Sequence, residues 1–174
     1  MAKKILIPVL ASAVLFCAVA HFMSVVWPQK SLEEKEIGSS DAPARVLIIG
    51  VTSDFKQAVI DRVTGVIKSD SLFIRIAGIK EIDKTEPPEW DAILLVNTCM
   101  GWDYDNRVKK LVQKNNDYDH FILFTSSGDP DACTKKKKLP GEIDAVSSAS
   151  VEEKISVVTD TLAAFITKHL GASK

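Results

Sequence analysis

The chain has 174 residues, 46% of them hydrophobic, and a formal net charge of −1. From Asp41 to Lys174 it carries 18 basic and 20 acidic side chains, so the net charge of this part is 18 minus 20, or −2. This balance lacks the basic excess with which proteins neutralise nucleic-acid phosphates, and no nucleic-acid partner is expected. The length suits one domain of about 130 residues after an N-terminal segment of about 40.

Residues 5–27 contain no Asp, Glu, Lys or Arg. A stretch of this length is sufficient for a helix to cross the hydrocarbon core of a bilayer. Lys3 and Lys4 precede it, and basic residues beside a span favour the cytoplasmic side. We therefore expect a single-pass membrane anchor with everything after Trp27 outside the cytoplasm.

The alternative is a signal peptide that is cleaved after the Ala-Val-Ala of residues 18–20. The uncleaved anchor is favoured because cleavage would leave the apolar residues 21–27 at the start of the mature chain. Serine, glutamate and glycine then dominate a stretch that is expected to be flexible. The predicted organisation is an anchor at 1–28, a linker at 29–44 and a folded domain at 45–171.

The domain alternates short apolar runs with amphipathic segments. The apolar runs predict five strands, at 45–50, 72–77, 92–96, 121–125 and 143–146. Three helices are expected to start at Asp54 with Gln57 in a capping box, at Asp103 or Asp105, and at Ser150 with Glu153 in a capping box, the last one ending at Gly171. This alternation predicts an α/β fold with a parallel sheet covered on both faces.

Three segments carry a resemblance to the flavodoxin family. Residues 90–96 look like its segment of an aromatic residue, an aspartate and a buried strand, residues 97–102 are similar to its second flavin-contacting loop, and residues 124–129 to its third. The resemblance covers residues 45–170 in order and spacing. It implies a three-layer sandwich whose five-stranded parallel sheet has the order 2-1-3-4-5, with a crevice for FMN beyond the carboxyl ends of strands 1, 3 and 4.

The first loop after Gly50 departs from the family. Flavodoxins have a hydroxyl- and glycine-rich run there that wraps the flavin phosphate. Thr52 and Ser53 are candidate hydrogen-bond donors, but a second glycine is missing and Asp54 adds a negative charge where the phosphate would lie. A plain helix-capping role for Asp54 is the alternative.

The second and third loops supply the remaining candidate cofactor-binding residues. Trp102 and Tyr104 are candidates for stacking on a flavin ring, and Asn97 and Thr98 for bonding its edge. Trp102 covering the end of the sheet is the alternative. The third loop contributes Ser127, Gly128 and Asp129, and beyond it Lys135 to Lys138 form either an anion-attracting cluster or a solvated loop.

Residues 144–150 carry a second, weaker resemblance. They look like the attachment motif of exported FMN-binding domains, in which the final hydroxyl, here Ser150, is esterified to FMN. Ser148 replaces the glycine of that motif and Ser150 its threonine. The alternative is that Ser150 caps the last helix.

Catalytic residues are not indicated. His21, His120 and His169 lie at no spacing that suggests a nucleophile–base pair, and metal-ligand spacing is absent. Cys99 and Cys133 follow neighbouring strands of the flavodoxin order, which favours a disulfide across the crevice, with two unrelated thiols as the alternative.

Two functions remain open. The first is a membrane-tethered extracytoplasmic protein that binds FMN and passes electrons to a membrane or periplasmic redox partner. The second is a flavodoxin-like domain without a cofactor that serves as a binding or assembly module at the membrane.

Overall fold

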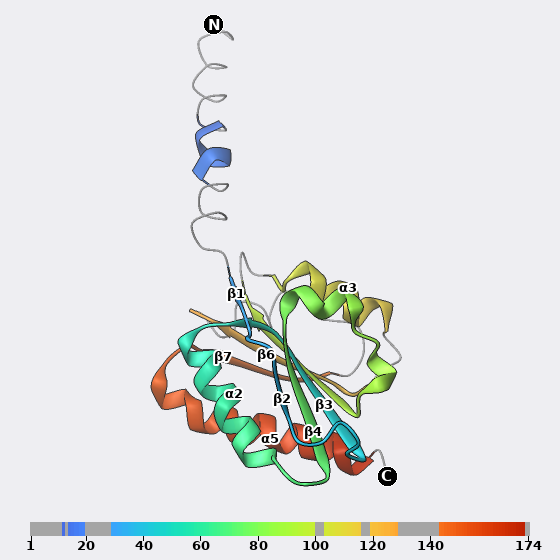
Figure 1. Ribbon diagram of the computed structural model, residues 1–174. Helices are drawn as coiled ribbons and strands as arrows, with labels where there is room; N and C mark the ends of the chain where they lie inside the picture. Colours follow the sequence, from blue (N-terminus) through green and yellow to red (C-terminus); the bar gives the residue numbers. More distant parts are fainter. Residues whose placement is uncertain are drawn as a thin grey trace, which may run out of the picture.

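One mixed sheet with helices on both of its faces forms the domain in the computed structural model (Figure 1). The structure describes residues 12, 14–19, 29–99, 103–115, 119–128 and 143–172. Within this part of the chain the sheet has seven strands: β1 (Lys30–Ser31), β2 (Lys35–Ile37), β3 (Ala44–Thr52), β4 (Leu72–Gly78), β5 (Ala92–Thr98), β6 (Phe121–Ser127) and β7 (Asp144–Ala149). Their order is β2-β4-β3-β5-β6-β7, and β1 pairs with β3 beside this path.

The five long strands are parallel neighbours in the order β4-β3-β5-β6-β7. This is the relative order predicted for the second, first, third, fourth and fifth strands, and it is that of the flavodoxin fold. Ile48, Leu94 and Ile122 are all 0% exposed, since both faces of a parallel sheet are covered. The predicted α/β, flavodoxin-like class is therefore confirmed.

The sheet as a whole differs from the five-stranded prediction because the expected linker contributes two short strands. β1 lies antiparallel on the carboxyl end of β3, and β2 lies antiparallel on β4. Between them Leu32 is only 3% exposed and packs in the core. The polar composition of residues 29–44 gave no sign of strands, because short charged edge strands need few apolar residues to pair with a sheet.

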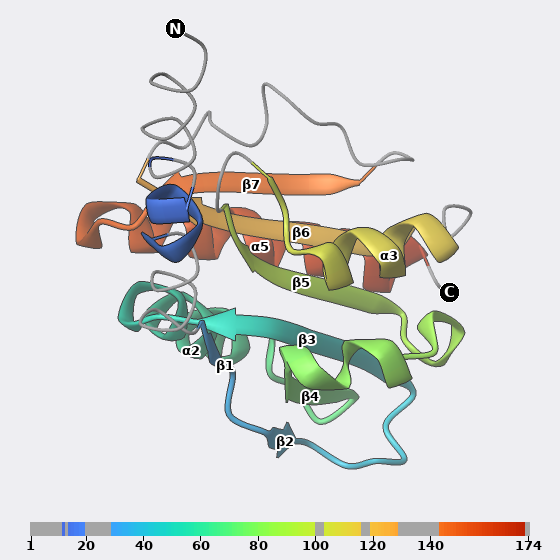
Figure 2. The same ribbon diagram turned by 90° about the horizontal axis from the view of Figure 1, so that it is seen from above.

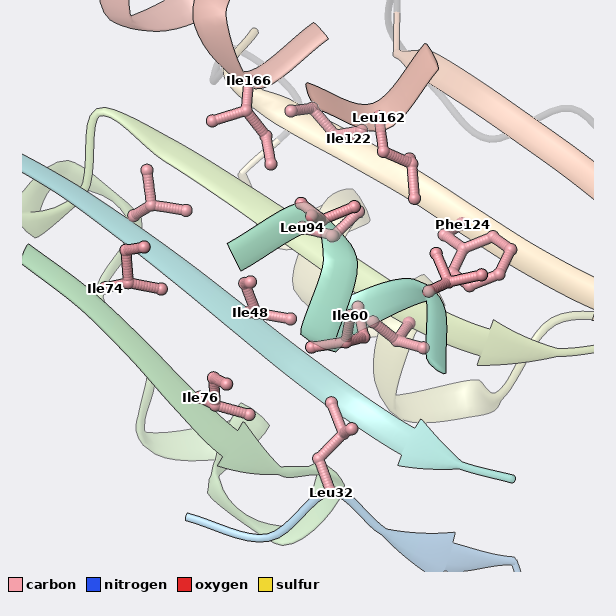
Figure 3. Close-up of a cluster of buried hydrophobic side chains, with 14 of the residues drawn as sticks. Leu32, Ile48, Ile60, Ile74, Ile76, Leu94, Ile122, Phe124, Leu162 and Ile166 are labelled. Atoms are coloured by element: carbon pink, nitrogen blue, oxygen red, sulfur yellow. The ribbon is translucent and has the colours of Figure 1, made fainter. Parts of the chain in front are cut away.

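The helices divide between the two faces of the sheet (Figures 1 and 2). α2 (Asp54–Ile67) and α5 (Ile155–Ala172) cover one face, and α3 (Asn106–Lys114) with the 3₁₀-helix η1 (Ile79–Lys84) covers the other. Two shorter 3₁₀-helices are η2 (Pro87–Glu89) and η3 (Glu152–Lys154). Figure 3 shows the α2/α5 face, where the side chains of helices and strands interdigitate.

The predicted start of α2 at Asp54 is confirmed but its predicted cap is wrong, and the predicted start of the last helix is wrong. α2 is capped by Ser53, whose Oγ accepts a hydrogen bond from the Lys56 amide, so Asp54 is already helical. Ser150 lies in a bend before η3 and α5 begins only at Ile155, so the capping box of Ser150 and Glu153 does not start this helix. Gly171 lies within α5 and does not end it. Asp105 caps α3, which confirms one of the two predicted starts.

Little of the predicted anchor falls among the described residues. Ser12 and residues 14–19 are helical, and Val14, Leu15 and Phe16 expose their side chains. Within the described ranges, no helix has both the length and the hydropathy that crossing a membrane requires.

Trp90 and Asp91 of the flavodoxin-like segment fix the start of β3. Asp91 Oδ2 accepts a hydrogen bond of 2.7 Å from the Arg45 amide. The Arg45 guanidinium lies over the rings of Phe73 and Trp90, at 5.4 and 4.9 Å from their centroids. These contacts give the segment a structural role at the amino edge of the sheet.

Gly50 is required by close packing of β3 against β5. Its φ is 154°, and a Cβ there would lie 2.0 Å from the Val96 carbonyl oxygen. We expect Gly50→Ala to lower the free energy of unfolding by roughly 3 kcal/mol, measured by chemical denaturation. Gly65→Ala is the matched control, because no atom lies within 4 Å of its Cβ position, and it should be neutral or stabilising by up to about 1 kcal/mol. Equal stability of the two variants would contradict this account.

Candidate functional site

The carboxyl ends of β3, β5, β6 and β7 lie at one edge of the sheet because these strands are parallel. In the flavodoxin topology the switch point is between β3 and β5, which is where a ligand crevice is expected. The structure brings Thr52, Asn97, Thr98 and Ser127 to this edge. Successive residues of each strand point to opposite faces, so these side chains divide between the two helix layers.

The first loop, which connects β3 to α2, is very short. β3 runs to Thr52, whose backbone pairs with Lys30 of β1, and Ser53 alone connects the strand to α2. The Ser53 hydroxyl and carbonyl are used within its own helix, since they accept from the amides of Lys56 and Gln57. The Thr52 hydroxyl lies 3.3 Å from both the Ser53 carbonyl oxygen and Gln57 Oε1. Asp54 is exposed beside them.

Lys56 is the main residue of this edge that sequence reasoning missed. Its side chain is 1% exposed, and Nζ donates a hydrogen bond to Thr98 Oγ1 at the end of β5. This contact joins the first turn of α2 to β5 across the switch point. A signal was available in the sequence, because Lys56, Val59, Ile60 and Val63 share the spacing of a buried helix face.

The amino group of Lys56 has no counter-charge among the described residues. No carboxylate of this part of the chain lies within ion-pair distance of Nζ. Burial lowers the pKa of Lys56 from 10.5 to about 8, because removal from water disfavours the ammonium form. A buried lysine in this state marks a functional-site candidate.

Hydroxyl side chains line the carboxyl ends of β5, β6 and β7 on the face of the sheet that α2 and α5 cover. Thr98, Ser126 and Ser148 are neighbours in register across β5, β6 and β7. They follow Val96, Phe124 and Val146 by two residues each, so they point to the same face as those core residues. Thr159 lies on the stripe of α5 that packs on this face, is 4% exposed, and its Oγ1 has no hydrogen-bond partner.

The opposite face holds Asn97 and Thr125, which are also register neighbours. Asn97 Oδ1 accepts a hydrogen bond of 3.0 Å from the Asp105 amide, which fixes the start of α3. Asn97 Nδ2 and Thr125 Oγ1 are buried without a partner. Unpaired buried polar atoms of this kind cost about 1 to 3 kcal/mol each, so their retention here suggests a ligand-related role.

Tyr104 does not offer a ring for stacking. It is only 8% exposed and packs in the α3-side core, where burial and, secondarily, Asp103 raise its pKa. Ser127 is half-buried at the end of β6, and Gly128 and Ser150 are exposed beyond their strands. The other candidate residues, Trp102, Asp129 and Lys135 to Lys138, lie outside the described residues.

Cys99 directly follows β5 and forms a disulfide, whereas Cys17 is free. Its predicted partner Cys133 lies outside the described residues, so the pairing of Cys99 with Cys133 stays a prediction.

A second polar cluster lies at the amino edge. The rings of His120 and His169 are 5.5 Å apart, and Asp144 Oδ2 lies 2.9 Å from both His169 Nε2 and Lys168 Nζ. Burial lowers the pKa of His169 although Asp144 opposes this shift. These four residues line a groove of about 500 Å³ with Asp119, Ile143 and Ala172, so no described lining residue is a hydroxyl or thiol nucleophile. Within the described ranges no group of three or more His, Cys, Asp or Glu side chains is arranged to hold a metal ion.

Comparison with known proteins shows structural likeness at low identity. No protein-family model matches the sequence, and no curated protein does. A flavodoxin from Archaea is 9% identical at a TM-score of 0.49, covering 72% of this chain and 98% of its own. The flavoenzyme NAD(P)H:(acceptor) oxidoreductase FerB of Paracoccus denitrificans is 12% identical at 0.45, covering 72% and 98%. The flavodiiron core Flv1 of Synechocystis sp. PCC6803 is 9% identical at 0.49, covering 76% and 37%.

The described residues do not fit FMN in the manner of a flavodoxin. A phosphate dianion there needs a loop of free amides and hydroxyls. A single residue separates β3 from α2, and its hydroxyl already caps the helix. Tyr104 is buried, so it supplies no stacking surface for the ring.

The depressed pKa of Lys56 predicts a pH-dependent stability. Below about pH 8 the folded chain holds a buried ammonium, and between about pH 8 and 10.5 the unfolded chain binds more protons at this position than the folded chain. Stability therefore rises with pH across this window. We expect Lys56→Met to have a higher free energy of unfolding than the wild type at pH 8. This difference should shrink by about 3 kcal/mol between pH 8 and pH 10.5.

Chemical denaturation at a series of pH values measures this gap in buffer free of polyvalent anions. Lys154→Met removes an exposed lysine from η3 and serves as the control, with a gap that does not change over the same window. A constant gap for Lys56→Met would show that Lys56 titrates normally in the folded chain.

Proposed function

We propose that this chain is a membrane-tethered, extracytoplasmic flavodoxin-like module that binds a ligand other than flavin at the carboxyl edge of its sheet. The carrying observation is the hydrogen bond from Lys56 to Thr98, which joins the first turn of α2 to the end of β5 across the switch point with a side chain of the protein itself. Together with the one-residue connection at Ser53, it replaces the loop of free amides and hydroxyls with which a flavodoxin wraps the flavin phosphate.

The tether and the location are supported by the sequence. Residues 5–27 contain no Asp, Glu, Lys or Arg, Lys3 and Lys4 precede them, and Val14, Leu15 and Phe16 expose their apolar side chains. A disulfide at Cys99 suits an oxidising compartment. These features support the prediction of a single-pass protein with its domain outside the cytoplasm.

A flavin-dependent electron carrier is the second candidate. Asn97 Nδ2 and Thr125 Oγ1 favour it, because they are buried polar atoms without partners at the ends of β5 and β6. A flavin ring presents both donors and acceptors along its edge, and the chain would supply orientation and electrostatics while the cofactor supplies the redox chemistry. Electrons would then pass to a membrane or periplasmic redox partner.

The visible absorption spectrum of the purified full-length chain in detergent separates the two candidates. We expect no flavin absorption as purified and no saturable change on titration with FMN. A flavin band that survives acid precipitation would indicate covalent attachment, with Ser150→Ala as the test of the attachment residue. A band that is lost on precipitation would support the second candidate. In that case Asp54→Asn should raise FMN affinity, since it removes a charge beside the phosphate while keeping a capping side chain.

The proposed topology is tested by fusing reporter enzymes to Lys174. We expect activity from a reporter that works only after export and none from one that works only in the cytoplasm. A matched variant with Lys3 and Lys4 replaced by Gln should weaken the orientation bias. Cytoplasmic reporter activity in the unmodified chain would overturn the assignment of location.

A further inference from the structure

The amino group of Lys56 is a buried cation for which the described residues supply one hydrogen-bond acceptor. An ammonium has three N–H donors, and Thr98 Oγ1 is the one acceptor that the described residues provide. A hydroxyl satisfies a donor and carries no charge. Buried charges in proteins are generally paired, so Lys56 retains the capacity to bind an anion.

The neighbouring side chains add donors and no competing anion. Ser126 is next to Thr98 in register, is 3% exposed and points to the same face. Thr159 approaches this face from α5 with an unpartnered Oγ1. Ser148 is the exception, because its hydroxyl donates to the Ala149 carbonyl oxygen. Among the described residues, the groups placed together here are the cation of Lys56, the hydroxyl of Thr98 and, in register with it, the hydroxyl of Ser126.

The position of Lys56 on α2 favours an anion further. Lys56 lies in the first turn, and side chains of a helix lean toward its N-terminus. The amino group thus lies toward the end of α2 where the helix dipole disfavours a cation and favours a negative group.

We propose that Lys56, with the hydroxyls of Thr98 and Ser126, binds a small oxyanion of the phosphate or carboxylate class where the first turn of α2 meets the carboxyl ends of β5 and β6. The inference deepens the proposed function by naming the ligand class of the flavin-free site. The anion neutralises the ammonium that folding has removed from water, and the hydroxyls donate to its remaining oxygens. Above the pKa of Lys56 the amine is neutral and this attraction is lost.

A purely structural Lys56 gives a different expectation. Its four methylenes would fill space between α2 and β5, and the hydrogen bond to Thr98 would satisfy the amine. Anions would then have no specific effect on the stability of the wild type or of Lys56→Met, in which a methionine of similar length fills the same space.

The test uses the full-length chain in detergent micelles with phosphate, sulfate and acetate as probes against chloride at equal ionic strength. Thermal unfolding is followed at pH 7 and pH 9.5, and phosphate affinity is measured by calorimetry at pH 7. We expect phosphate or acetate to raise the unfolding temperature in a saturable way at pH 7 and much less at pH 9.5. Phosphomonoester and short carboxylate probes, compared in the same assay, identify the source of the group.

Three variants make the outcome specific. Lys56→Met should weaken binding at least tenfold, and Lys154→Met, which changes an exposed lysine, should leave it unchanged. Thr98→Val and Ser126→Ala should each weaken it several-fold, and they keep the test valid if Lys56→Met does not fold. A wild type without saturable binding, or the same binding in Lys56→Met as in the wild type, overturns the proposal.

The failure of this inference is distinguishable from that of the proposed function. A colourless chain that binds neither FMN nor the anions rejects the oxyanion site and leaves the flavin-free module standing. FMN binding that depends on Lys56 rejects the flavin-free module and assigns the oxyanion site to a cofactor phosphate.

Discussion

Burial of both faces of the parallel sheet is the constraint on which the rest of the structure depends. Ile48, Leu94 and Ile122 pack under α2 and α5, and Leu47, Ile93 and Leu123 pack under α3 and η1. Nearly every strand position is thereby committed to a core. Polar groups that a ligand can use are left at the strand ends, where the last residues of β5 and β6 change from valine and phenylalanine to Asn97, Thr98, Thr125 and Ser126. The location of the candidate site follows from this change.

Lys56 is an exception to this division between apolar core positions and polar strand ends. It occupies a core position of α2, although a buried ammonium without a counter-charge is unfavourable. A leucine or methionine would fill the same helix face without a charge penalty. The charged ammonium of Lys56 lowers the stability of the folded protein at neutral pH. The protein nevertheless keeps this group at the carboxyl edge of the sheet. Sites that violate local folding rules are those where function is expected.

The sequence predicted the parallel sheet well because its strands are continuous apolar runs between amphipathic segments. It failed where a signal was short or depended on contacts. β1 and β2 were missed since Leu32 and Ile37 stand alone among charged residues, and only docking on β3 and β4 makes them strands. The start of α5 was misplaced because Ser150 and Glu153 match a capping box, whereas η3 intervenes. The structure places Thr52, Asn97 and Thr98 at one edge of the sheet. Lys56 was not among the candidate residues, and the burial of Tyr104 depends on how the start of α3 packs.

The N-terminal strand also constrains how the candidate site is presented. β1 begins at Lys30, only three residues after Trp27, and Lys30 pairs with Thr52 at the carboxyl end of β3. Three residues span at most about 10 Å, so under the proposed topology an anchor that ends at Trp27 would hold the carboxyl edge within that distance of the bilayer surface. Under the proposed topology the candidate site at Lys56 would therefore lie beside the membrane, whereas the histidine pair at the amino edge would lie at the far end of the sheet. A ligand or partner of this site would approach along the membrane surface, and the short connection would restrict the angles at which a bulky soluble protein reaches it.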